Sequence, residues 1–148
     1  MKPRIYTDTS VLGGCEDDEF RDPSRRLLET FVGGELTLVL SELVLRELET
    51  APEGVRMVIG QVPEAHIEAI LLSPDAEELA AAYIEEGAIG ARMRADALHI
   101  ALATVARVDV LVSWNFKYSP PTVRSVGPRA APWAPNTPTW NTRNGIDP

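Results

Sequence analysis

The stretch from Arg94 to Lys117, RADALHIALATVARVDVLVSWNFK, decides the fold of this chain. Its first half is rich in Ala and Leu, which are good helix formers, and it predicts a helix from Ala95 to Val105. The short β-branched run from Asp109 to Ser113 is typical of a strand buried on both faces. Asp96 would lie in the first turn of that helix, where a carboxylate is favoured, and Asn115 just past the strand. Open α/β sheets bind ligands beyond that end of their strands.

The rest of the chain continues this alternation of strands and helices. Buried apolar runs predict strands over Arg4–Asp8, Leu36–Leu40 and Ile67–Leu72. Helices are expected between them. One begins at an Asp22 cap with Pro23 in first position, and a second, Glu42–Glu49, follows a Ser41 cap. A third begins at Pro52, and a fourth spans Ala76–Glu86. Gly13 and Gly14 are expected to break the chain after the first strand. The order predicts a three-layer α/β/α fold with a mainly parallel central sheet.

Composition bounds the class of protein. At 148 residues and 45% apolar, the chain fits one globular domain. Cys15 is the single cysteine, so no disulfide forms within the chain, which fits a reducing cytoplasm. No run resembles a signal peptide or a membrane-spanning helix. The net charge of −8 argues against a general nucleic-acid binder but leaves room for an enzyme that grips phosphate through a metal ion.

Three carboxylates are the candidate site residues, and each has a simpler interpretation. Asp8 ends the first strand, where it also suits a turn. Glu47 lies near the buried face of its helix, although most helical charges are solvated. Asp96 shares a helix face with His99, which is a possible ligand or a packed core histidine. Clustered carboxylates raise one another's pKa, and a hard divalent cation such as Mg²⁺ or Mn²⁺ neutralises them.

Four motifs in order resemble one known family. They are Tyr6-Thr-Asp8-Thr-Ser10-Val11, Ser41-Glu-Leu-Val-Leu-Arg-Glu47-Leu48, Ala95-Asp96-Ala97-Leu98-His99-Ile100-Ala101 and Val112-Ser113-Trp114-Asn115-Phe116. Across roughly residues 4–118 the chain resembles the PIN-domain proteins, and in particular the VapC-type toxins of type II toxin–antitoxin systems. The resemblance predicts a PIN-like α/β fold.

The resemblance also implies a function. It implies a cytoplasmic Mg²⁺- or Mn²⁺-dependent endoribonuclease whose catalytic and metal-binding positions fall on Asp8, Glu47, Asp96 and Asn115. Ser10 and Ser113 would be supporting polar groups. The family's fourth polar position is often Asp, and an amide there supplies oxygen without charge. A homodimer and a VapB-like antitoxin partner are implied as well. Four cations near the proposed site, which would either meet RNA phosphates or pair with surface acids, are Arg46, Arg92, Arg94 and Lys117.

Two other functions stay open from the sequence. A catalytically decayed PIN module that only binds an antitoxin or another partner fits Asn115 and the unusual C-terminal segment. A phosphatase or phosphoacceptor domain using Asp8 fits less well, because Thr9 and Ser10 supply no second acid beside it.

The segment 119–148 differs from the PIN-like domain over 1–118. It holds seven of the twelve prolines, two of the three tryptophans and one acidic residue, Asp147, and its prolines are expected to interrupt every strand. One interpretation is a proline-rich extension. The other is a frameshift product. Suitable codons for Pro121–Gly127, read one base back, encode Asn-Arg-Lys-Ile-Arg-Gly, which is similar to the basic segment of related PIN proteins.

Overall fold

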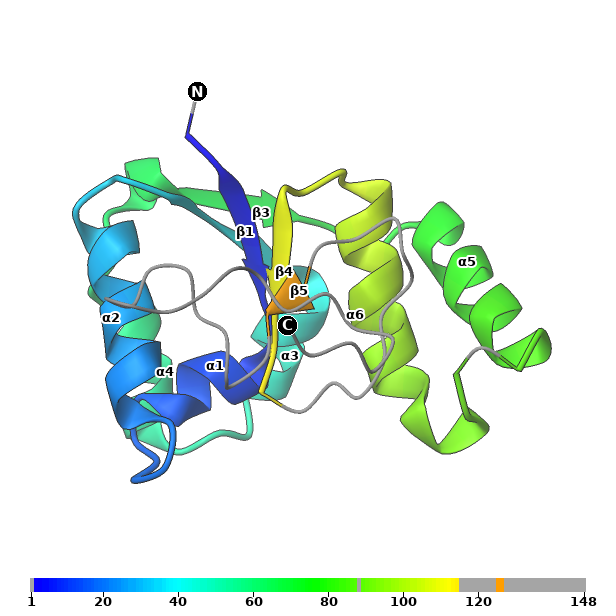
Figure 1. The fold of residues 1–148 in the computed structure, drawn as a ribbon, viewed down its shortest axis with the longest axis horizontal. Coiled ribbons are helices and arrows are strands. Elements are labelled where there is room, and N and C mark those ends of the chain that lie inside the picture. The colour runs from blue at the N-terminus through cyan, green and yellow to red at the C-terminus, as the bar shows by residue number, and fades with distance from the viewer. Residues whose placement is uncertain (1, 88, 115–124, 127–148) are drawn as a thin grey trace.

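A computed structural model describes residues 2–87, 89–114 and 125–126 of the chain (Figure 1). The described strands form one five-stranded sheet in the order β3-β2-β1-β4-β5, and every neighbouring pair is parallel. Their bounds are β1 (Arg4–Thr7), β2 (Thr37–Ser41), β3 (Ile67–Ile70), β4 (Val110–Val112) and β5 (Ser125–Val126).

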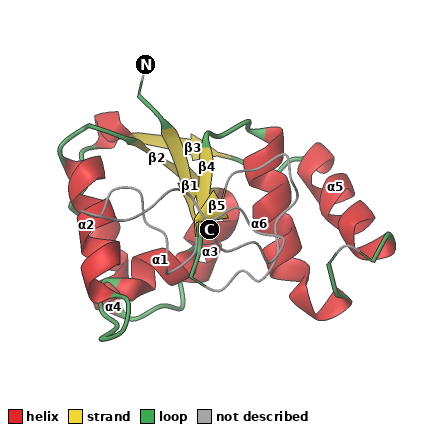
Figure 2. Cartoon of the chain, in the orientation of Figure 1, coloured by secondary structure: helices red, strands yellow, loops and turns green. Residues whose placement is uncertain are grey.

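Helices cover both faces of this sheet, which gives the predicted three-layer α/β/α arrangement. Helices α1, α2 and α4 lie on one side of the strands, and α5 and α6 on the other (Figures 1 and 2). The bounds are α1 (Thr9–Gly14), α2 (Arg21–Val32), α3 (Glu42–Leu48), α4 (Glu53–Gly60), α5 (Pro74–Glu85) and α6 (Arg94–Val105), with 3₁₀ turns at Glu64–His66 and Ala91–Met93. None of the helices in the described part of the chain is long and apolar enough to cross a membrane.

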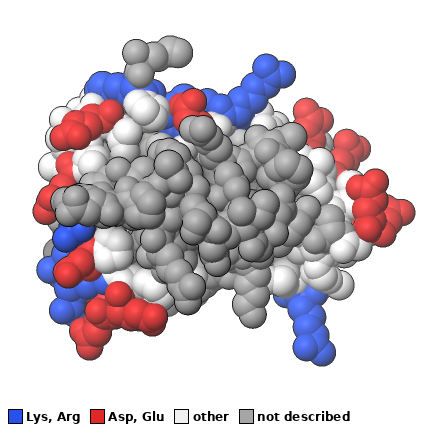
Figure 3. All heavy atoms as spheres, viewed as in Figure 1, with Lys and Arg blue, Asp and Glu red and all other residues white. Residues whose placement is uncertain are grey.

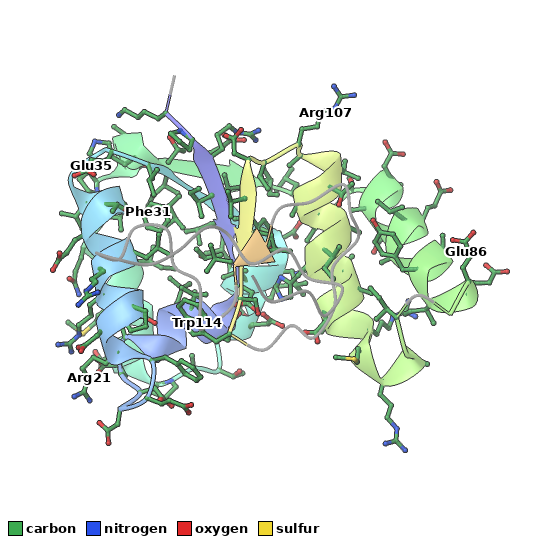
Figure 4. All side chains as sticks on the ribbon, in the orientation of Figure 1. Arg21, Phe31, Glu35, Glu86, Arg107 and Trp114 are labelled. Carbon is green, nitrogen blue, oxygen red and sulfur yellow. The ribbon has the colours of Figure 1, made fainter. Side chains whose placement is uncertain are left out.

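The central strands owe their position to their apolar side chains. Leu38, Val39, Leu111 and Val112 are fully buried, as expected for parallel strands covered by helices on both faces. Phe31 packs from α2 toward the sheet and is 2% exposed (Figure 4). The four predicted strands are therefore present, although β1, β3 and β4 are shorter than predicted.

The break expected at Gly13 and Gly14 is wrong, because both glycines lie inside α1. Asp8 caps this helix, and its side chain accepts a hydrogen bond from the backbone N–H of Val11. Gly14 is needed for close packing, since a Cβ there would lie 2.3 Å from Ser24 Oγ and 2.9 Å from Trp114 Nε1. The missing side chain thus lets α1 pack against α2 and the end of β4.

Two further boundaries differ from the predictions. Helix α2 begins at Arg21 with Phe20 in the cap position, so Asp22 lies in the first turn instead of capping it. The expectation that prolines interrupt every strand after Tyr118 is wrong at Ser125–Val126, which pair with β4. This dipeptide lies between Pro121 and Pro128, and the rest of the segment 119–148 lies outside the described residues.

The strand order sets the place of the candidate site. The chain moves from β1 outward to β2 and β3, then returns to the other side of β1 with β4. The point where the direction changes is the boundary between β1 and β4. In open α/β sheets, ligands bind beyond the carboxyl ends of the strands at such a point. Asp8 follows β1 there, and Ser113 follows β4.

Candidate active site

Asp8 is the most enclosed carboxylate of the site. It is 4% exposed, and Ser10 Oγ and Ser113 Oγ each donate a hydrogen bond of 2.6 Å, one to each carboxylate oxygen. Burial raises the pKa of Asp8, while the nearby His99 and the two serine hydrogen bonds lower it. Asp8 therefore serves as the cap of α1 and also presents a carboxylate at the boundary between β1 and β4.

The chain just after β4 is fastened to α1 and α2. The backbone N–H of Trp114 donates to Ser10 Oγ at 3.0 Å, and its indole Nε1–H donates to Ser24 Oγ at 2.9 Å. The Trp114 ring stacks on Phe20 with centroids 5.8 Å apart (Figure 4). These contacts fix the chain immediately before Asn115. Asn115 itself, the fourth predicted site residue, lies outside the described residues.

Glu47 reaches the site from α3 and is not a plain surface charge. Its Oε1 accepts a hydrogen bond from Thr9 Oγ1 and lies 3.1 Å from His99 Nε2. The hydrogen bond with His99 lowers the pKa of Glu47, so this carboxylate is ionised at neutral pH. Its side chain is one-third exposed, which leaves it accessible from solvent.

His99 is a packed, hydrogen-bonded histidine, as the simpler interpretation predicts. It is 3% exposed, and its Nδ1 lies 2.6 Å from Tyr6 Oη. Tyr6 Oη in turn lies 2.8 Å from Ser41 Oγ, which accepts a hydrogen bond from the N–H of Val44. The chain of contacts from Ser41 to Glu47 joins β2, β1, α6 and α3.

Asp96 completes the group from the first turn of α6. Burial raises its pKa first, and the negative charges of Asp8 and Glu47 raise it further, while His99 lowers it. The three carboxylates therefore lie close enough for their charges to act on one another. This is the electrostatic situation that a bound cation relieves.

The donor set fits a hard divalent cation in chemistry, because it consists of carboxylates in mutual repulsion. As the described side chains are placed, no group of three His, Cys, Asp or Glu residues is arranged to hold a metal ion. Within the described part of the chain, the hydrogen bonds of the Glu47 carboxylate both use Oε1. Asp8 and Asp96 are then the acids with the strongest electrostatic reason to share a cation.

The described cations near the proposed site differ in whether they form a salt bridge or are exposed. Arg46 pairs with Glu42 at 2.7 Å, so the salt-bridge interpretation holds for it, while Arg92 and Arg94 are exposed. Lys117 lies outside the described residues. Glu42 also accepts a hydrogen bond from the N–H of Leu72 at 2.9 Å. It therefore ties α3 to the segment after β3.

Tyr6 and Thr9 are the site residues that the sequence interpretation missed. Their hydroxyls contact His99 and Glu47, respectively. A signal for Tyr6 was present, because residues two apart in a strand face the same side of a sheet, and Tyr6 precedes Asp8 by two.

The comparisons with known proteins rest on structure. No family model matches the sequence, and no curated protein matches it significantly. The VapBC2 complex of Rickettsia felis, bound to a promoter DNA fragment, matches with a TM-score of 0.58 and 18% identity, over 84% of this chain and 98% of that one. A toxin–antitoxin complex of Klebsiella pneumoniae matches with a TM-score of 0.58 and 20% identity, over 80% and 94%.

The third structure is VapC20 of Mycobacterium tuberculosis, described as a toxin that cleaves the sarcin–ricin loop. It matches with a TM-score of 0.54 and 17% identity, over 72% of this chain and 86% of that one. This chain has a VapC-like fold. The PIN-like α/β fold predicted from the four motifs is thereby confirmed, and at these identities the likeness is one of fold.

Proposed function

We propose that this chain is a Mg²⁺- or Mn²⁺-dependent endoribonuclease of the PIN/VapC toxin type that hydrolyses RNA phosphodiester bonds. The observation that carries the proposal is the effect of Asp8 and Glu47 on Asp96, whose pKa their negative charges raise in addition to burial. They lie on a VapC-like fold at the boundary where parallel α/β sheets keep their ligands. The fold of VapC20, a toxin described as cleaving the sarcin–ricin loop, supports the same reaction class.

In this proposal Asp8 and Asp96 hold the metal ion, and Glu47 and Asn115 complete the set of oxygen donors. When bound, the ion activates a water molecule and stabilises charge on the leaving oxygen. Ser10 and Ser113 keep the Asp8 carboxylate in one orientation through their two short hydrogen bonds. A fixed orientation matters because misplacing a reacting group by about 1 Å can cost roughly 100-fold in rate.

The partners belong to the same proposal. Two of the similar structures are toxin–antitoxin complexes, which supports a VapB-like antitoxin as partner of this chain. A homodimer, an RNA substrate and a cytoplasmic location are further parts of the proposal. The net charge of −8 provides no general attraction for RNA, so the proposed metal ion would supply the positive charge at the scissile phosphate.

Cleavage of RNA by the purified chain tests the proposal. We expect Mn²⁺-dependent cleavage that stops on chelation. Its rate should fall about 100-fold or more in Asp8→Asn and Asp96→Asn, because losing a metal ligand should reduce activity more than losing a group that only supports a ligand. Asn is as good a helix cap as Asp, so Asp8→Asn preserves the start of α1. Asp75→Asn, at an exposed position in the first turn of α5, is the matched control. Equal cleavage by all variants would contradict the proposal.

A catalytically decayed module that binds an antitoxin is the second candidate. Asn115 favours it, because an amide holds a cation less tightly than a carboxylate. This candidate predicts antitoxin binding by a folded chain that cleaves no RNA at any Mn²⁺ concentration.

A further inference from the structure

We propose that His99, held by Tyr6 and Ser41, is a positioning residue that fixes the Glu47 carboxylate for the metal ion. This inference rests on the proposed function and adds to it a residue that does not itself touch the ion or the RNA. It is carried by the contacts from Ser41 Oγ to Tyr6 Oη, from Tyr6 Oη to His99 Nδ1, and from His99 Nε2 to Glu47 Oε1.

The chemistry of the groups gives this chain of hydrogen bonds a direction. A carboxylate only accepts hydrogen bonds, so His99 Nε2 is the donor in its contact with Glu47 Oε1. In the tautomer with its proton on Nε2, His99 Nδ1 accepts, and the Tyr6 hydroxyl is the donor that faces it at 2.6 Å. Ser41 Oγ accepts from the N–H of Val44 and is free to give its own hydrogen to Tyr6 Oη.

The exposure of the side chains shows that the buried residues restrain the partly exposed Glu47. Tyr6 and Ser41 are fully buried and His99 is nearly so, whereas the Glu47 side chain is one-third exposed. An exposed glutamate samples several rotamers, and ordering it in a complex costs entropy. The buried chain restrains one oxygen, Oε1, with help from Thr9, and no hydrogen bond among the described residues uses Oε2, the oxygen that would face the cation.

A role in packing alone does not account for these residues. Burying a hydroxyl and an imidazole costs free energy unless each finds a partner, and an apolar side chain would fill the same space without that cost. Here each polar group contacts the next, and the last contact is with the Glu47 carboxylate. The negative charge of Glu47 in turn raises the pKa of Asp96. The arrangement thus serves the orientation of Glu47.

The first test needs neither metal nor RNA. Long-range proton–nitrogen NMR spectra of the full chain report which ring nitrogen of His99 carries the proton. We expect protonation at Nε2 in the wild type and a changed His99 signal in Tyr6→Phe, which removes one hydroxyl and keeps the ring. A proton on Nδ1 of the neutral ring, or a His99 signal untouched by Tyr6→Phe, would overturn the inference.

The second test compares His99→Gln with His99→Leu by Mn²⁺ titration. The amide of Gln can replace the Nε2 donor, whereas Leu fills the space without one. We expect Mn²⁺ affinity to fall about tenfold in His99→Leu and to stay near wild type in His99→Gln, in line with losses on removing groups that orient metal ligands. Thermal melting of each variant confirms that both are folded.

Two outcomes separate the inference from the proposed function. If the wild type binds Mn²⁺ and His99→Leu binds it equally well, the positioning role is wrong and the function stands. If the folded wild type binds no Mn²⁺, the proposed function is wrong, and with it the role of His99 toward a metal. Adding His99→Leu to Glu47→Gln should cost nothing further, because both changes act through one carboxylate.

Discussion

At the scale of single residues, Asp8 shows why a sequence pattern supports two interpretations at once. A short acidic side chain after a strand suits a turn, and it also suits a site at the sheet edge. Asp8 meets both descriptions, since it caps α1 and is held by serines from α1 and from the end of β4. The turn and site interpretations of Asp8 are therefore compatible. The residues next to Asp8 in the sequence do not indicate this, because Ser113 comes from a distant part of the chain.

Arg4 leads to a prediction about acid stability. Its guanidinium binds Glu68 through two hydrogen bonds of 2.8 and 2.6 Å, and it also donates to the carbonyls of Ala106 and Arg107. The hydrogen bond from Arg4 lowers the pKa of Glu68 from its ordinary value of 4.5. The ion pair thus stabilises the fold above about pH 4.5, and this stability is lost as pH falls through the folded-state pKa.

Glu68→Gln isolates that contribution. Because both side chains are partly exposed and solvent screens the pair, we expect a loss of up to about 1 kcal/mol in unfolding free energy at pH 7. The difference from the wild type should shrink below about pH 4.5, which urea unfolding from pH 7 to pH 3 would measure. A difference that stays constant over this range would show that the charge of Glu68 has no part in it.

At the scale of elements, α1 is the helix that the sequence did not indicate. It has six residues, two of them glycine, and isolated helices of this length are unstable in water. Its stability comes from the Asp8 cap and from packing against Ser24 of the next helix and Trp114, which lies far along the chain. The buried strands and α6 were predictable, because their residue types and periods match their environment.

Gly13 and Gly14 form a matched pair that tests this account of α1. A Cβ at Gly14 would clash with Ser24 Oγ and Trp114 Nε1 and disturb their hydrogen bond, so Gly14→Ala should cost about 1–3 kcal/mol. A Cβ at Gly13 meets nothing within 4 Å, so Gly13→Ala should be neutral or stabilise the helix by up to about 1 kcal/mol. Denaturant unfolding of both variants measures the contrast. Similar effects would mean that the close approach of Trp114 is unimportant.

At the scale of the whole molecule, charge and topology point to one region. Exposed acids gather on the outer edge of α5, and they include Glu77, Glu78, Glu85 and Glu86 (Figure 3). Such a surface does not attract RNA. The proposed chemistry therefore belongs to the boundary between β1 and β4 and not to this acidic surface. The alternating order of elements allows Asp8, Glu47 and Asp96 to meet at this edge although they are distant in sequence, and the charges of Asp8 and Glu47 do act on Asp96.

The finer arrangement of the site was beyond the sequence for a physical reason. Whether Glu47 meets a cation, a histidine or water depends on how α3 and α6 pack, and periodicity fixes only which face is buried. The contact of Glu47 with Thr9 and His99 is the result of that packing. Asn115 and most of the segment 119–148 lie outside the described residues, so their predicted roles stay predictions.

The central claim is that Asp8 and Asp96 together hold a divalent cation. Calorimetric titration of Mn²⁺ into the wild type and into the Asp8→Asn/Asp96→Asn variant tests it most directly, with circular dichroism to show that both chains are folded. We predict binding heat in the wild type and none in the variant, because the variant lacks the two charges that repel each other in the free protein. A folded wild type that binds no Mn²⁺ would contradict the claim and favour a module that acts only by binding its partner.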